Sequence, residues 1–304
     1  MPLHYELSDL RLLLILMRTR SLSASGEAAH LTTSAVSLRL RKLEDGIGAQ
    51  LFTRTGKGLV PTEAGTALAE AAVPILAEAA ALDARLNPFS KHDPEPLRIF
   101  SNSTGLQNFL CRIAADYLRE NSSFRAVLTE HRSSLTPEAV LTGEADLGLI
   151  GGVRDLSPAF RTKLELVPFV EDRHVVILPR DSRAAQQFKN RPILFAELLN
   201  LRFAALTDAS PMTAAMKERA LAAGFRFEPI IEAPSFSLLV ELVARGPLAA
   251  VVPASAVPPN APVEVRELED SWAARPLAFV LPKARPALSS AIDFVEFALR
   301  TQKR

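Results

Sequence analysis

The chain has 304 residues, of which 48% are hydrophobic, and its formal net charge is +1 at pH 7. This composition is sufficient for two or three folded domains and excludes a disordered chain. The small net charge excludes binding to polyanions through overall charge, so a contact with nucleic acid must depend on local charge. A single cysteine, Cys111, excludes an internal disulfide.

The N-terminus shows no export signal, because Glu6, Asp9 and Arg11 interrupt its apolar residues. No window approaches 18 uncharged apolar residues, the minimum for a membrane-spanning helix. We therefore expect a soluble, cytoplasmic protein with no membrane partner.

Basic residues are concentrated near the N-terminus. Residues 1–62 contain eight Lys or Arg against five acids, and five of those eight bases lie between residues 39 and 57. This local surplus points to a surface that faces phosphates.

Three helices are predicted in these residues. Ser8 is a suitable N-cap for "DLRLLLILMRTR", and "GEAAH" predicts a short second helix. The third helix is expected to begin after Thr32 and to end at Gly46 or Gly48. Three helices with short turns, of which the third is basic, form the helix-turn-helix pattern.

The third helix has one apolar stripe, made by Val36, Leu40, Leu43 and Ile47 at helical spacing. A helix that lies in a major groove needs short polar groups for close approach and Arg for base edges or phosphates. The side opposite the stripe supplies both, and its residues are Ser34, Ser37, Leu38 and Arg41, flanked by Arg39 and Lys42. The alternative is that this side is the solvated face of an ordinary amphipathic helix.

After this helix, "LFTRTGKGLVPTEAG" predicts a short strand pair around Gly56 and Gly58. Arg54 and Lys57 lie at its tip. The hairpin therefore has the character of a basic wing that reaches backbone phosphates.

The stretch "SLSASGEAAHLTTSAVSLRLRKLEDGIGAQLFTRTGKGLVPTEAG" resembles the winged helix-turn-helix of the LysR-type transcriptional regulators. The matching residues are Ala-Val-Ser at 35–37, Leu43-Glu44, Gly48, Leu51-Phe52, Arg54 and Thr62-x-Ala64-Gly65. The chain departs from the family pattern in the scaffold at Ser25, Gly26 and Ala29, and on the DNA side at Thr33, Leu38 and Arg39. The second group of departures concerns which DNA sequence is bound, not whether DNA is bound.

The resemblance implies a role for each polar residue of the domain. Those that approach bases are Thr33, Ser34, Ser37 and Arg41. Those that approach phosphates are Arg39, Arg54 and Lys57. Leu38 is placed either to touch a thymine methyl group or to pack on a neighbour.

A long helix is predicted over residues 63–87, with Thr62 as its N-cap. Its apolar residues recur every three or four positions, at Ala64, Leu68, Ala71, Ile75, Ala79, Leu82 and Leu86. We expect this seam to pair with its copy in a homodimer, and the alternative is packing on domains of the same chain. The family resemblance implies the same dimer and adds a homotetramer. Pro74 predicts a kink.

Residues 88–96 contain three prolines and no periodicity, so they are predicted to form a hinge after the DNA-binding domain (1–62) and the linker helix. Strand-like and helix-like runs then alternate through 97–304. This pattern resembles the two-lobe, periplasmic-binding-protein-like effector domain of the same family. Lobe I is predicted to comprise 97–168 and 263–304, and lobe II 169–262, which makes the protein α/β overall.

Ligand sites in such sheets lie beyond the carboxyl ends of the strands. Three such junctions are polar, namely "SNSTG" at 101–105, "TDASP" at 207–211 and "PSFS" at 234–237. They suit a small anionic metabolite, notably a carboxylate. The predicted effector-binding residues are Ser101, Ser103, Thr104, Thr207, Asp208 and Ser235. The alternative is that the serines are ordinary N-caps, and Asp208 disfavours an anion unless it is paired.

The sequence carries no enzyme signature. Cys111 lies in an amphipathic helix, where we expect it to be buried, and the five histidines lack the spacing of zinc ligands. We therefore predict no catalytic residue, metal or cofactor. The expected function is a LysR-type regulator that binds double-stranded DNA and responds to a small-molecule effector. The alternative is an α/β solute-binding or enzymatic protein whose N-terminal helices mediate protein contacts only.

Overall fold

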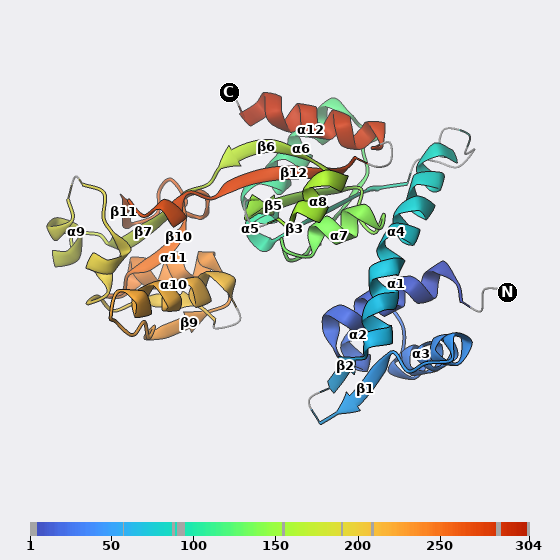
Figure 1. The fold of residues 1–304 in the computed structure, drawn as a ribbon. Coiled ribbons are helices and arrows are strands. Elements are labelled where there is room, and N and C mark those ends of the chain that lie inside the picture. Colours follow the sequence, from blue (N-terminus) through green and yellow to red (C-terminus); the bar gives the residue numbers. More distant parts are fainter. Residues whose placement is uncertain are drawn as a thin grey trace.

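The computed structural model describes residues 5–56, 58–86, 89, 95–153, 156–189, 191–207, 210–283 and 287–302. It contains an N-terminal helical domain with a two-stranded wing, one long helix, and an α/β part with two lobes (Figure 1). The predicted fold class is confirmed. Lys57, Asp208 and most of the predicted hinge lie outside the described residues.

The N-terminal domain consists of α1 (Leu7–Thr19), α2 (Leu22–Ala29) and α3 (Thr33–Ile47), followed by β1 (Phe52–Thr55) and β2 (Gly58–Pro61). The predicted end groups of α3 are confirmed. The Thr32 hydroxyl accepts from the Ala35 N–H at 3.2 Å, and Gly48 ends the helix in the left-handed conformation at φ 77°.

The first two helices begin differently from the prediction. Glu6, not Ser8, is the N-cap of α1, and its backbone N–H donates to the Asp9 carboxylate at 3.0 Å. The second helix starts at Leu22, well before "GEAAH", because the Ser21 hydroxyl caps it by accepting from the Ala24 N–H. The polar run that suggested a gap is therefore the first turn of α2.

Helix α4 (Glu63–Leu86) leads from this domain to lobe I and is continuous across Pro74, so the kink stays a prediction. One side of α4 is buried, and Ala72 and Leu76 on that side join the core formed by α1 and α3. By length and composition Glu63–Asp83 is also able to span a membrane, which corrects the expectation that no stretch comes near this limit. Within the subunit this helix packs against α1 and α7.

Lobe I is built on a five-stranded sheet in the order β4-β3-β5-β12-β6. Its strands are β3 (Leu97–Ser101), β4 (Ala126–Glu130), β5 (Leu147–Gly151), β6 (Leu164–Glu171) and β12 (Pro276–Pro282). β3 pairs in parallel with β4 and β5, whereas β12 is antiparallel to β5 and β6.

Helices cover both faces of this sheet. Aromatic side chains, including Tyr117 of α6 and Phe294 of α12, fill one face, and α7 packs with Phe100 and Val280 on the other. The helical segments of lobe I are α5 (Ser103–Gly105), a π-helical turn (Leu106–Leu110), α6 (Cys111–Glu120), α7 (Thr136–Leu141), α8 (Pro158–Lys163) and α12 (Ser289–Gln302). Cys111 is exposed, because it lies on the outer side of α6, so the expectation of a buried thiol was wrong.

Lobe II contains a three-stranded sheet in the order β10-β7-β11 and a parallel pair, β8-β9. A bridge between Phe203 and Ala249 joins the two sheets. The strands are β7 (His174–Pro179), β8 (Ala204–Leu206), β9 (Ile231–Ala233), β10 (Ala250–Pro253) and β11 (Val263–Glu267). The helices are α9 (Arg183–Gln187), α10 (Pro211–Ala222) and α11 (Phe236–Arg245), with short 3-10 turns at Phe195–Leu198, Ala254–Ala256 and Ser271–Ala273.

One lobe boundary differs from the prediction. β11, which was assigned to lobe I, pairs with β7 along its whole length and therefore belongs to lobe II. The chain returns to lobe I only after Glu267, where β12 takes its place between β5 and β6. The crossing strands β6 and β12 lie side by side and extend towards lobe II (Figure 1).

The N-terminal domain and lobe I also touch within the subunit. Gly143, with φ +73°, follows α7 and lies against α4, where a Cβ would come within 2.6 Å of the Ala80 Cβ. Beside this contact the Arg18 Nη1 of α1 lies 3.4 Å from Glu144 Oε2. α4 thus packs on both domains that it connects.

We predict that Gly65→Ala destabilises the N-terminal domain. An added Cβ would overlap the Leu51 carbonyl oxygen, which is backbone and has little freedom to move. Overpacking of this kind costs about 1–3 kcal/mol, so we expect unfolding at lower urea concentration, followed by circular dichroism. Gly56→Ala is the matched control, because among the described residues no heavy atom beyond the chain neighbours of Gly56 lies within 4 Å of its Cβ position. Equal midpoints for the two variants would contradict the prediction.

Candidate nucleic-acid interface and ligand site

The side of α3 that the sequence assigned to a groove is uncovered. Val36, Leu40 and Leu43 point into the core with at most 5% exposure. On the opposite side Leu38 is 53% exposed. The other predicted residues of this side divide into exposed ones (Thr33, Ser34, Arg41 and Lys42) and half-buried ones (Ser37 and Arg39). The amphipathic pattern is thus real, and no other part of the described subunit covers its polar side.

The wing is tied to α3 and to α1. The Arg54 Nη2 donates to the Ser37 hydroxyl at 3.2 Å, which joins the predicted phosphate contact to the predicted base contact. The Leu59 N–H donates to the Arg20 carbonyl at 2.8 Å. Gly58 has φ +112°, and a Cβ there would lie 2.6 Å from that carbonyl oxygen, so a glycine is needed at this close approach.

The bases of this surface are available to an external anion. In the part of the chain that the structure describes, no carboxylate lies within ion-pair distance of Arg39, Arg41, Lys42 or Arg54. The nearest acid in sequence, Glu44, is engaged elsewhere, because its carboxylate accepts from the backbone N–H groups of Leu51 and Phe52. The local charge of α3 and the wing is therefore positive.

A second polar region lies where the two lobes meet. Pro253, the last residue of β10, pairs with His174, the first residue of β7, two positions after Asp172 at the crossing. The strands β8 and β9 run parallel to β10, so their carboxyl ends also point to this junction. In lobe I the carboxyl ends of β3, β4 and β5 lie next to the start of β12. This is the position where doubly wound sheets hold ligands.

The predicted effector residues of lobe I lie in different environments. Ser101 is fully buried and its hydroxyl donates to the Leu149 carbonyl at 2.6 Å, so it supports the sheet and we remove it from the candidate set. Thr104 is 6% exposed and Ser103 is half-buried. Asn102, and not Ser103, is the N-cap of α5, because its side-chain oxygen accepts from the Gly105 N–H.

The predicted residues of lobe II lie at the strand ends. Thr207 is exposed and follows β8, and Ser235 is the N-cap of α11, as the alternative interpretation of the serines has it. The Thr207 N–H donates to the Ala233 carbonyl at 3.2 Å, which brings the ends of β8 and β9 together. Thr207 and Ser235 therefore occur on neighbouring strand ends.

Sequence reasoning missed the residues that tie these strand ends together. The Ser133 hydroxyl accepts from the Asn102 side chain at 2.9 Å and from the Gly151 N–H at 3.4 Å, which joins the ends of β3, β4 and β5. Across the junction, the Asn108 side chain donates to the Ser255 hydroxyl at 2.9 Å. No motif marks these residues, although "SNSTG" did point to the correct loop.

Asp172 lies at the centre of the crossing and is 4% exposed. Its two carboxylate oxygens accept from the N–H and the hydroxyl of Ser255 at 3.1 and 2.9 Å. Since Ser255 also binds Asn108 of lobe I, Asp172 is part of a hydrogen-bonded connection between the lobes.

His174, at the start of β7, is held in its neutral form. Burial is the largest cause that lowers its pKa, the positive charges of Arg275 and Arg219 act in the same direction, and one hydrogen bond to the Trp272 backbone opposes them, which together bring the pKa to about 4. Its Nδ1 and the Trp272 Nε1 are buried without a hydrogen-bond partner among the described residues. A protonated imidazole is therefore disfavoured at this place.

Two stretches of the chain match known families. Residues 90–303 match the LysR substrate binding domain, and residues 7–66 match the bacterial regulatory helix-turn-helix protein of the lysR family. The chain belongs to the LysR family. The family consists of transcriptional regulators rather than enzymes, which agrees with the prediction made from the sequence.

Curated relatives of this LysR-family chain are similar over part of their length. The uncharacterized HTH-type transcriptional regulator YeiE of Escherichia coli (strain K12) is 29% identical over 184 residues, which is 60% of each chain. The HTH-type transcriptional activator IlvY of Salmonella typhimurium is 31% identical over 48% of this chain and 50% of its own length. The RuBisCO operon transcriptional regulator of Allochromatium vinosum is 30% identical over 71% of this chain and 68% of its own. The chain thus spans between half and about two thirds of the length of these relatives.

Solved structures share the whole fold. A variant of full-length OxyR from Pseudomonas aeruginosa has a TM-score of 0.62 at 20% identity and covers 98% of this chain and 95% of its own. Full-length CbnR in complex with its target DNA has a TM-score of 0.52 at 17% identity and covers 98% of this chain and 100% of its own. The order of helix-turn-helix domain, long helix and two lobes is therefore that of complete LysR-family proteins.

Acid should destabilise the protein through His174. Its folded pKa is lowered from 6.5 to about 4, so the unfolded chain binds a proton that the folded chain refuses. The stabilisation is complete above pH 6.5 and is lost as the pH falls from there towards 4. Between pH 7 and pH 5 we expect the unfolding free energy to fall by roughly 2 kcal/mol more in the wild type than in His174→Gln.

Urea titrations at several pH values measure this difference. His30→Asn is the control, because His30 is exposed and its left-handed backbone at φ 54° accepts Asn. If the unfolding free energies of the wild type and of His174→Gln changed in parallel with pH, His174 would have the same pKa in the folded and unfolded states, which would contradict the prediction.

Proposed function

We propose that the chain is a cytoplasmic DNA-binding transcriptional regulator whose contact with promoter DNA is modulated by a small-molecule effector at the junction of the two lobes. The observation that carries this proposal is the uncovered polar side of α3, joined through Arg54 and Ser37 to a basic wing. An uncovered basic surface of this shape fits a major groove and its flanking phosphates.

The proposed DNA contacts follow from the geometry of α3. Its N-terminal end presents Thr33 and Ser34, whose short side chains permit close approach to base edges. Ser37 and Arg41 continue this side and are proposed to read bases, with Leu38 on a thymine methyl group. Arg39 and Arg54 are proposed to bind phosphates. Lys57 has the same role on sequence grounds alone, because it lies outside the described residues.

The exposed side of α4 is proposed to form a homodimer. Ile75, Leu82 and Leu86 are 41%, 57% and 55% exposed, although they belong to the apolar seam. Ala64 and Leu68, at the start of the seam, pack against the core of the same subunit, so only the later part of the seam is free for a second copy. Pairing two such helices places two α3 helices on one DNA molecule, which suits a palindromic site.

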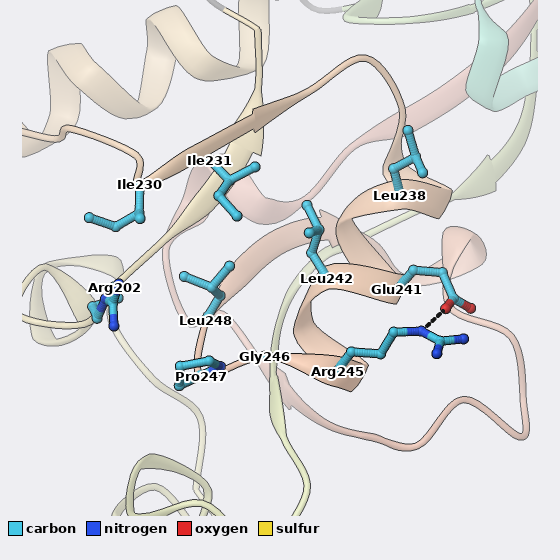
Figure 2. Close-up of a pocket in the computed structure, with 10 residues that line it drawn as sticks. All are labelled: Arg202, Ile230, Ile231, Leu238, Glu241, Leu242, Arg245, Gly246, Pro247 and Leu248. Carbon is cyan, nitrogen blue, oxygen red and sulfur yellow. Dashed lines mark hydrogen bonds and ion pairs between the residues drawn. The ribbon is translucent and has the colours of Figure 1, made fainter.

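A groove on lobe II is proposed as the second contact that a homotetramer needs. A pocket of about 370 Å³ lies between β9, α11 and the segment before β10. Figure 2 shows the residues that line it, mainly Ile230, Ile231, Leu238, Leu242 and Leu248. β9 is an edge strand, and so is β4 of lobe I, where Val127 and Leu128 are exposed. Two edges of this kind in one subunit permit a reciprocal contact between lobe I of one copy and lobe II of another.

A solute-binding or enzymatic protein is the alternative class. It leaves the positive surface of α3 without a role, and it predicts negligible affinity for duplex DNA even at low salt. The regulator predicts binding that weakens steeply as salt rises, because phosphate contacts release counterions.

Substitutions on α3 and the wing should affect DNA in different ways. We expect Arg54→Gln to weaken binding to all duplexes alike and to reduce the salt slope by about 1. Arg41→Gln or Ser34→Ala should cost about 1–3 kcal/mol on the preferred sequence and less on others. Fluorescence anisotropy with genomic fragments selected by the protein measures both effects.

Arg11→Gln is the matched control for this experiment, since it removes the same charge from an exposed position of α1. It should leave binding close to the wild type. If Arg41→Gln and Arg54→Gln changed every sequence equally, the separation into base and phosphate contacts would be wrong.

Charges placed in the seam of α4 should separate the subunits. The double variant Ile75→Glu, Leu82→Glu puts two carboxylates per subunit where two copies are proposed to meet, and we expect the mass measured by sedimentation equilibrium to fall to half that of the wild type. Thr66→Glu is the control, because Thr66 lies on the opposite side of the same helix from Ile75. A double variant that keeps the wild-type mass would exclude this seam as the interface.

A further inference from the structure

Arg275 lies where the chain re-enters lobe I. It directly precedes β12, and its backbone carbonyl accepts from the Asp172 N–H at 2.9 Å, so both crossing segments meet at this residue. Its side chain is 15% exposed. Burial lowers the pKa of Arg275, and the nearby Asp172 carboxylate opposes that effect. A positive charge is thus held mostly away from water at the junction of the lobes.

The guanidinium of Arg275 has no hydrogen-bond acceptor in the described part of the chain. Its nearest charged partner is Asp172, whose Oδ2 lies 3.6 Å from Nη1, which is beyond hydrogen-bond distance. Asp172 is already engaged, because both of its oxygens accept from Ser255. A guanidinium carries five N–H donors, and a buried charge without acceptors is costly.

The guanidinium of Arg275 lies against the end of β5. A Cβ at Gly151 would lie 2.8 Å from the Arg275 Nε and 3.2 Å from Nη2, so the missing side chain lets the guanidinium lie against the end of β5. The Gly151 N–H binds the Ser133 hydroxyl, which also binds Asn102. Arg275 is therefore at the same strand ends as the polar loops of lobe I.

We propose that Arg275 is the anchor for an anionic effector, and that it binds a small oxyanion of the carboxylate, sulfate or phosphate class. This inference rests on the proposed effector site and names the residue that selects the charge of its ligand. A planar guanidinium pairs with an oxyanion through two parallel hydrogen bonds, which satisfies its free donors. None of the three polar loops recognised in the sequence supplies such a group.

Binding at this position also affects the contact between the two lobes. An oxyanion on Arg275 competes with Asp172 for the guanidinium, and Asp172 holds Ser255, which binds Asn108 across the lobes. The charge of the ligand therefore affects the hydrogen bonds that connect the two lobes.

The test is a thermal-shift and calorimetric series on the full chain. The probes are C2 to C6 mono- and dicarboxylates, sulfate and phosphate, each compared with sodium chloride of equal ionic strength and with the neutral amide of the same acid. We expect saturable stabilisation by at least one oxyanion, none by its amide, and at least tenfold weaker binding in Arg275→Gln. The probe that binds identifies the class.

Two measurements keep the result independent of folding defects. Arg226→Gln, at an 89% exposed side chain, is the matched control and should bind the oxyanion as the wild type does. NMR titration of His174 gives a second readout, because Arg275 lowers its pKa. Oxyanion binding should raise the pKa of His174 in the wild type and not in Arg275→Gln.

The proposal is overturned if no oxyanion binds saturably, or if Arg275→Gln binds as tightly as the wild type. DNA binding by the ligand-free wild type is measured in parallel. If the wild type does not bind DNA, the proposed function itself is refuted. If it binds DNA but no oxyanion, only the role of Arg275 is refuted.

Discussion

The architecture depends on α4 having two apolar sides with different tasks. Its small residues allow close packing within the subunit, where Ala72 lies in the core of the helical domain and Ala80 lies against Gly143 of lobe I. Leu76 also lies in that core, whereas Ile75, Leu82 and Leu86 remain outside this packing. Most of the stability of a helix in a protein comes from the packing of its apolar sides. Its buried side therefore fixes the DNA-binding domain on lobe I, and its exposed side is what a partner subunit can use.

The described contacts form a continuous connection from the lobe junction to the DNA-binding domain. His131 follows β4 next to the strand ends and forms a hydrogen bond, at 3.1 Å, with Thr136, the first residue of α7. α7 packs against α4, and the adjacent Glu144 pairs with Arg18 of α1. Burial lowers the pKa of His131, and the charge of Arg18 lowers it further, so the imidazole responds to the same interdomain contact. Packed elements and ion pairs of this kind are able to carry coupling between two distant sites.

Prediction from sequence succeeded where the decisive interactions are local. The stripe of Val36, Leu40 and Leu43, the Thr32 cap and the Gly48 terminator each depend on neighbours within a few turns, and all are present. It failed for α2, where a run of serines resembled a gap, and for Cys111, whose outward orientation depends on how α6 packs on the sheet. It also placed β11 in the wrong lobe, because a strand sequence does not state its pairing partner.

The sequence by itself determined the side of α3 that faces outward, because periodicity, capping residues and charge clusters are properties of short segments. It indicated the family through a resemblance carried by residues 21–65. Only the tertiary structure decided which polar groups converge at the junction. Ser255 meets Asp172 across 83 positions and Asn108 across 147. The position of the Arg275 guanidinium, 3.6 Å from the Asp172 carboxylate, is likewise visible only in the folded chain. Contacts between residues so far apart leave no local pattern, since they arise from the folding of one lobe against the other.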